Sequence, residues 1–150
     1  MQIKYVAMIT NVTNGTIRKK QQIAFRRLIQ GKSPSIKIIE YIGLNFFELK
    51  QWFGPKMLPG MNWNNYGDVW MIEHLVGLDF FDLTKEEDCK LAWSYKNLIP
   101  IFSEHVYSIR GQYTFSLRYL EKMEKCPIVE KLISILENDS KKYEKYLKYN

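Results

Sequence analysis

The sequence is poor in cysteine, and this scarcity excludes several kinds of protein. Its 150 residues include two cysteines, Cys89 and Cys126, which lie far apart and do not have the spacing of metal ligands. A zinc ribbon built on cysteine clusters is therefore excluded. Two isolated thiols also fit a reducing compartment better than a disulfide scaffold.

Long hydrophobic stretches are missing as well. The most apolar segment, residues 36–44, is interrupted by Lys37 and Glu40, whereas a membrane-spanning helix needs about 20 apolar residues. The N-terminal residues 1–4 lack the apolar stretch and the cleavage site of a signal peptide. We therefore expect no membrane partner and no secretion. With 46% hydrophobic residues, the chain has enough material for the core of one ordinary domain.

Positive charge is in excess and is unevenly distributed. The formal net charge is +6; residues 1–40 hold eight Lys and Arg and one acid, whereas residues 67–90 hold seven acids and two lysines. Such a basic block is typical of a phosphate-binding surface, although a solvated Lys-rich surface gives the same count. The candidate DNA-binding residues are Arg18, Lys19, Lys20, Arg26, Arg27 and Lys32.

Turn formers and apolar periodicity predict several helices. Residues 1–19 are expected to form a strand or extended arm with a turn at Asn14-Gly15. Three helices should follow, over residues 20–30, from the cap Ser33 to about 42, and over 46–53 behind the cap Asn45. Later helices are expected from a capping box of Thr84 and Glu87 to about 93, from 103 towards 122, and from 127 onwards, the last with a regular apolar side.

Two short strands are expected within this helical pattern, at residues 69–75 and 98–102. We predict that they pair as an antiparallel hairpin-like unit packed on a helix. The sequence thus predicts an α+β fold.

Three segments of the sequence occur in the order and with the spacing of a known set of motifs. The first is the basic run 25–33, Phe-Arg-Arg-Leu-Ile-Gln-Gly-Lys-Ser, with Tyr-Ile-Gly at 41–43, and the second is Pro-Gly-Met-Asn-Trp-Asn-Asn-Tyr-Gly at 59–67. The third combines Trp-Met-Ile-Glu-His at 70–74, Phe-Asp-Leu-Thr at 81–84 and Tyr-Lys-Asn-Leu-Ile-Pro-Ile-Phe at 95–102. Together they resemble the HNH-like endonucleases of phages and large DNA viruses, over more than half of the chain.

The resemblance implies a ββα-metal core with N-terminal helices and a C-terminal helical extension. In that scheme residues 1–110 form the HNH-like domain and residues 111–150 form the extension, for which the family offers no counterpart. The two expected strands and the helix after Ser103 would make up the ββα unit.

The resemblance also implies a set of site residues. His74 would be the general base that activates water, Asn97 would orient the loop, and Glu73 would bind Mg²⁺ or a similar divalent ion if the protein is active. The family's last ligand falls at Val106, and a valine cannot coordinate a metal. His105 is the candidate replacement, but adjacent residues of a helix point about 100° apart.

Three functions remain open at this stage. The favoured one is a phage-encoded HNH-fold protein with impaired or lost catalysis, a DNA-proximal structural or assembly component of the virion. It would contact DNA and, through its C-terminal helices, other phage proteins, in the host cytoplasm or the virion. The second is an active, homing-type HNH endonuclease that has recruited His105 or Glu104 as a metal ligand. The third is a regulatory protein that binds another protein without DNA.

Overall fold

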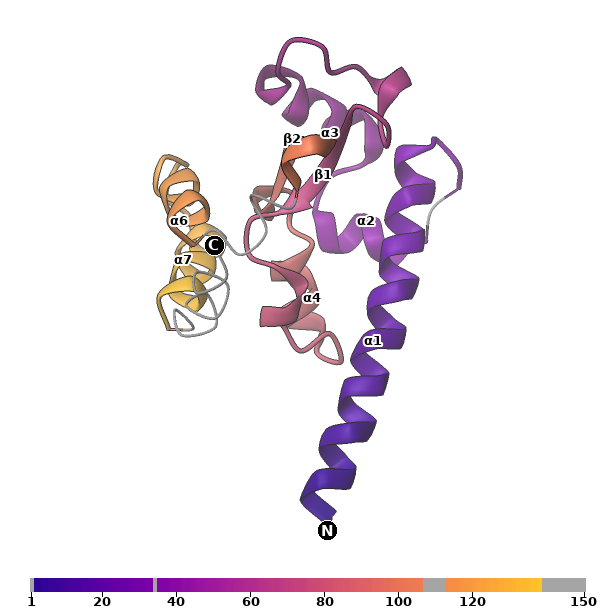
Figure 1. The fold of residues 1–150 in the computed structure, drawn as a ribbon, viewed down its shortest axis with the longest axis vertical. Helices are drawn as coiled ribbons and strands as arrows, with labels where there is room; N and C mark the ends of the chain where they lie inside the picture. Colours follow the sequence, from indigo (N-terminus) through magenta and orange to yellow (C-terminus); the bar gives the residue numbers. More distant parts are fainter. Residues whose placement is uncertain (1, 34, 107–112, 139–150) are drawn as a thin grey trace.

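The computed structural model describes residues 2–33, 35–106 and 113–138, with side chains from Asn14 onwards. It is mostly helical and contains one two-stranded sheet (Figure 1), so the predicted α+β class is confirmed. The helices and strands are α1 Gln2–Ile29, α2 Ile36–Ile42, α3 Phe46–Phe53, β1 Trp70–His74, α4 Glu86–Ala92, β2 Leu98–Phe102, α6 Tyr113–Glu121 and α7 Pro127–Asn138. Short 3-10 helices lie at Gly54–Lys56, Trp63–Asn65, Leu78–Phe80, Tyr95–Asn97 and Ser103–His105.

The sheet is the two-stranded unit that the sequence predicts. Strands β1 and β2 pair in antiparallel fashion, with Trp70 opposite Phe102 at one end and His74 opposite Leu98 at the other. Strand β2 is buried over Leu98–Ile101, and Trp70 in β1 is fully buried. The pairing of residues 69–75 with 98–102 is therefore confirmed, and it sets His74 at the end of a strand.

The N-terminal segment is where the prediction was wrong. Residues 1–19 were expected to be extended with a turn at Asn14-Gly15, but α1 is one continuous helix from Gln2 to Ile29. The Asn14 side-chain oxygen accepts a hydrogen bond from the backbone N–H of Leu83 at 2.9 Å. Because this tertiary contact uses the Asn14 side chain, the local turn preference of Asn-Gly is overridden. The helix ends at Ile29, one residue before the predicted end, and Gly31 behind it has a φ of 71°.

Of the three predicted helix caps, one is confirmed and two were wrong. Asn45 caps α3 as predicted, because its side chain accepts from the N–H of Glu48 while Glu48 accepts from the N–H of Asn45. The predicted cap of α2 was wrong: Ser35, not Ser33, precedes that helix, without a side-chain hydrogen bond. Pro34, expected to open α2, lies outside the described residues.

The predicted capping box at the start of α4 was also wrong. That helix begins at Glu86 after Lys85, which makes no side-chain cap hydrogen bond. Thr84 instead donates its N–H and its hydroxyl to the carboxylate of Asp82. The carboxylate two residues upstream competes with the helix for the Thr84 side chain, which is the usual reason such residues form turns.

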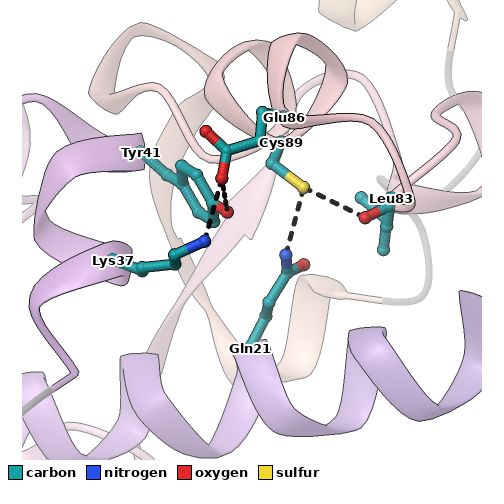
Figure 2. Close-up of polar contacts among 6 residues, drawn as sticks. All are labelled: Gln21, Lys37, Tyr41, Leu83, Glu86 and Cys89. Carbon is teal, nitrogen blue, oxygen red and sulfur yellow. Dashed lines mark hydrogen bonds and ion pairs between the residues drawn. The ribbon is translucent and has the colours of Figure 1, made fainter.

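Helices α1 and α2 are tied to α4 by polar contacts (Figure 2). The Gln21 amide donates to the buried sulfur of Cys89 at 3.2 Å, and the Cys89 thiol donates to the carbonyl of Leu83 at 3.3 Å. Lys37 in α2 pairs with Glu86 at 2.9 Å on the exposed side of the same region. Burial raises the pKa of Cys89, so this thiol is a packing residue in its neutral form.

The C-terminal helices complete the core from the side of the molecule opposite to α1 (Figure 1). As the sequence predicts, α7 begins at Pro127 and buries Val129, Leu132 and Leu136. Of the helix expected after Ser103, the structure shows the 3-10 turn Ser103–His105 and α6. The predicted domain boundary at residues 110 and 111 lies outside the described residues.

None of the helices in the described part of the chain combines the length and the apolar character that a membrane crossing requires.

Candidate functional site

A cleft of about 690 Å³ lies between α1 and β1 with the loop that follows β1. One wall comes from the last three turns of α1, and the other from β1 and the 3-10 helix Leu78–Phe80. The residues lining it are Arg18, Gln22, Phe25, Arg26, Gln30, Tyr66, Gly67, Met71, Ile72, Glu73, His74, Leu75, Gly77, Leu78, Asp79, Phe80, Trp93 and Val106. A concave site with a few convergent polar groups is the usual form of a binding or active site.

The cleft brings together residues that the sequence placed in separate motifs. Glu73 and His74, Val106, and the two basic residues Arg18 and Arg26 all line it. The other candidate DNA-binding residues, Lys19, Lys20, Arg27 and Lys32, do not line the cleft and are exposed. Positive side chains therefore lie both in the cleft and on the surface beside it.

The imidazole of His74 packs against an aromatic ring that is itself held in place. Its ring centre lies 4.6 Å from that of Trp93 in an edge-on arrangement of 80°. The Trp93 indole N–H donates to the side-chain oxygen of Gln21 at 2.8 Å. Gln21 of α1 therefore fixes the orientation of Trp93, and Trp93 limits the positions open to His74. Neither contact could be predicted from the sequence, because each partner is far away in the chain.

Asn97 lies beneath the loop after β1 and is fully buried. Its side-chain amide donates to the carbonyls of Val76 at 3.0 Å and Ala92 at 2.9 Å, while its side-chain oxygen accepts from the N–H of Val76 at 2.8 Å. The arrangement orients the residues directly after His74, which is the role that the resemblance implies. Asn97 does not line the cleft, and a part in catalysis stays a prediction.

A second side chain beneath the same loop comes from outside the resemblance. The hydroxyl of Ser116 in α6 donates to the carbonyl of Leu75 at 2.6 Å and is buried. The C-terminal helices therefore contribute directly to the position of the segment that follows His74. Sequence analysis missed this residue, since a single serine within a helix carries no signal of a long-range contact.

Charged residues on both walls of the cleft influence the pKa of Tyr66. The pKa of its phenol is raised to about 12, chiefly by burial; the hydrogen bond from the N–H of Ile72 and the positive charge of Arg26 act to lower the pKa, and the negative charge of Glu73 acts to raise it. The phenol oxygen also accepts a weak hydrogen bond from the N–H of Ile72 at 3.5 Å. At neutral pH Tyr66 is therefore protonated and able to donate a hydrogen bond to an anionic group.

An ion pair joins the two walls of the cleft. Arg18 of α1 contacts the carboxylate of Asp79 at 2.6 Å. Both side chains keep a large exposed fraction, 42% for Arg18 and 69% for Asp79. One of the predicted DNA-binding residues is thus already engaged by an acid of this chain.

The residues of the cleft do not fit the metal site that the resemblance implies. The implied ligand Glu73 lines the cleft with the implied base His74, but the position of the family's last ligand is the apolar, buried Val106. His105 lines a different pocket, with Lys56 and Tyr119, and its Nε2 lies 3.5 Å from the carboxylate of Glu104. Among residues 14–33, 35–106 and 113–138, no group of three or more His, Cys, Asp or Glu side chains could hold a metal ion.

Comparison with known proteins adds viral relatives without a described function. Two uncharacterized proteins of Acanthamoeba polyphaga mimivirus are similar to this chain, one with 33% identity over 67 residues and the other with 29% over 62 residues. The first match covers 45% of this chain and 30% of the relative, and the second covers 41% and 27%. The matches thus span less than a third of each relative. No family model and no solved structure matches the chain.

Proposed function

We propose that this chain is a viral DNA-binding protein built on an HNH-like ββα scaffold whose catalysis is impaired or lost. It would act as a DNA-proximal structural or assembly component of the virus. The observation that carries the proposal is the composition of one cleft, in which Arg18 and Arg26 lie beside Glu73 and His74 while Val106 takes the place of a metal ligand.

The scaffold part of the proposal is supported by the two strands. The antiparallel pairing leaves His74 at the end of β1, and the chain turns through Ser103–His105 directly after β2. Asn97 hydrogen-bonds to Val76 in the loop after His74, which supports the loop-orienting role that the resemblance implies. The motif residues thus occupy mutually consistent positions although the sequence separates them by more than twenty residues.

The DNA-binding part is supported by charge and exposure. Arg26 lines the cleft, and Lys19, Lys20, Arg27 and Lys32 are exposed on α1 or directly after it. Exposed lysines and arginines bind phosphates without reading sequence, and such binding weakens steeply as salt rises. We therefore expect largely sequence-independent contacts along α1.

Weak catalysis follows from the chemistry of Val106. A Mg²⁺-like ion prefers oxygen ligands and is held by few protein groups, so the loss of one group weakens binding strongly. The ion would supply charge stabilisation at the scissile phosphate. A general base alone contributes only about 10²–10⁴-fold to a reaction rate, so His74 by itself does not give efficient phosphodiester hydrolysis.

An assembly role is supported by two further observations. Helices α6 and α7 have no counterpart in the HNH motifs, yet they share the core and, through Ser116, hold the loop beside the cleft. The relatives in hand are proteins of a virus. These helices would present a surface to other viral proteins while the opposite side of the molecule contacts DNA.

The proposal is tested by two measurements on the full chain. Fluorescence anisotropy with a duplex oligonucleotide should show binding. The logarithm of the association constant should fall linearly with the logarithm of the salt concentration. Plasmid nicking in millimolar Mg²⁺ or Mn²⁺ should be absent or close to background. A chain that does not bind DNA at low salt would overturn the proposal and favour a regulatory protein that binds only protein.

An active endonuclease is the second candidate, because Glu73 and His74 do line the same cleft. It requires that a residue other than Val106 supplies the ligand atom that completes the coordination of the metal ion. Robust nicking that disappears in His74→Ala, with the same variant still binding DNA, would establish this function in place of the first.

A further inference from the structure

An ion pair between Arg18 and Asp79 joins the two walls of the cleft. Arg18 belongs to α1, and Asp79 belongs to the 3-10 helix after β1, 61 residues further along. Because the pair lies in the lining of the cleft, any ligand that enters there meets it.

The charges that line the cleft are balanced rather than basic. Two arginines, Arg18 and Arg26, are offset by two carboxylates, Glu73 and Asp79. Asp79 opposes phosphate binding in two ways, since its charge repels a phosphate and its oxygen occupies the guanidinium that would bind one. Phosphate binding should therefore be less favourable in the cleft than on the basic surface of α1.

We propose that Asp79 is an autoinhibitory residue that holds Arg18 away from DNA, so that Arg18 contacts a phosphate oxygen only when it releases Asp79. This inference rests on the DNA-binding function proposed above and specifies how its cleft is regulated. Both partners are substantially exposed, at 42% and 69%. Exposed ion pairs are weak and are screened by salt, so the exchange is accessible in solution.

Asp79→Asn tests the inference by removing the charge while keeping the shape of the side chain. We expect this variant to bind duplex DNA about threefold to tenfold more tightly than the native chain, because one arginine becomes free and one repulsive charge is lost. The salt dependence should become steeper by about one unit of slope, which corresponds to one additional phosphate contact. Anisotropy titrations at several salt concentrations measure both quantities.

Two comparisons separate this mechanism from a general effect of charge. Asp68→Asn removes an exposed acid that does not line the cleft, and it should leave the slope unchanged. In an Arg18→Gln background, Asp79→Asn should lose its effect on the slope, because there is no guanidinium to release.

The outcomes are distinct. An unchanged affinity in Asp79→Asn and in a second variant, Asp79→Ala, with native folding verified by circular dichroism, overturns the autoinhibitory role alone. The autoinhibitory role is also overturned if Asp68→Asn strengthens DNA binding as much as Asp79→Asn does. It is overturned as well if Asp79→Asn still steepens the salt dependence in the Arg18→Gln background. A complete absence of DNA binding in both the native chain and Asp79→Asn overturns the proposed function together with this inference.

Discussion

The two walls of the cleft are held in place in different ways. On the side of β1, the residues after His74 are fixed from within the core: Asn97 hydrogen-bonds to Val76, and Ser116 to Leu75. On the side of α1, the cleft is lined by the buried Phe25 and by exposed long side chains such as Arg26. One wall is therefore held by buried hydrogen bonds, and the other presents charged side chains beside a core residue.

This difference separates stability from binding. Substitutions beneath the β1 wall remove buried hydrogen bonds and should unfold the protein before they reveal anything about ligands. Substitutions on the exposed flank of α1 remove charge and leave the core unchanged, so they should alter DNA binding at nearly constant stability.

The largest effect is expected for Asn97→Ala. The change leaves the N–H and carbonyl of Val76 and the carbonyl of Ala92 without their side-chain partner in a fully buried place. Each buried polar group left unsatisfied costs about 1–3 kcal/mol, so the free energy of unfolding should fall by about 3 kcal/mol or more. Urea denaturation measures the change. Asn64→Ala, at an exposed position, is the control and should change stability by less than about 0.5 kcal/mol.

The next effect is expected for the double charge reversal Arg26→Glu/Arg27→Glu. Both side chains are exposed on α1, and Arg26 also lines the cleft. Loss of two phosphate contacts and the added repulsion should weaken DNA binding by about tenfold to a hundredfold and reduce the salt slope by about two units. The midpoint of urea denaturation should stay nearly constant.

A matched pair of lysines on the other side of the molecule controls for net charge. Lys125→Glu/Lys131→Glu changes the total charge by the same amount at exposed positions before and within α7. If this pair weakens binding as much as the α1 pair, then DNA does not contact α1 and the charge effect is long-range.

The parts of the fold that could be predicted from sequence are those with local signals. The strands around Trp70 and Leu98, the cap Asn45 and the end of α2 near residue 42 depend on residue types within a few positions of one another. The extent of α1 could not be predicted, because Asn14 contacts Leu83, 69 residues away. A turn former that makes a tertiary contact gives the same local signal as a turn former in a turn.

The same division applies to the candidate site. The resemblance implied that Glu73, His74 and position 106 belong to one site, and all three line one cleft. The sequence did not predict the partner of Arg18 or the hydrogen bond from Ser116 to Leu75, since each depends on how distant elements pack. The charges and side chains that modify the cleft therefore come from packing between distant elements.

The smallest effect on binding is expected for Val106→Asn. This variant tests whether the β1 wall lacks only one ligand for a divalent metal ion. Val106 is 3% exposed and lines the cleft with Glu73 and His74. An asparagine there would place an amide oxygen, a suitable ligand for Mg²⁺ or Mn²⁺, in the same cleft. We expect weak divalent binding, with a dissociation constant on the order of millimolar, and a stability cost of about 1–3 kcal/mol for burying the amide.

Val106→Leu is the matched control, because leucine and asparagine are similar in size and leucine has no donor oxygen. Titration with Mn²⁺, followed by electron paramagnetic resonance of the free ion, should detect binding in Val106→Asn and in neither Val106→Leu nor the native chain. Equal binding in all three would show that Glu73 and His74 hold the ion without position 106. The impaired catalysis proposed above would then lose its physical cause, and the active endonuclease would become the better account of the cleft.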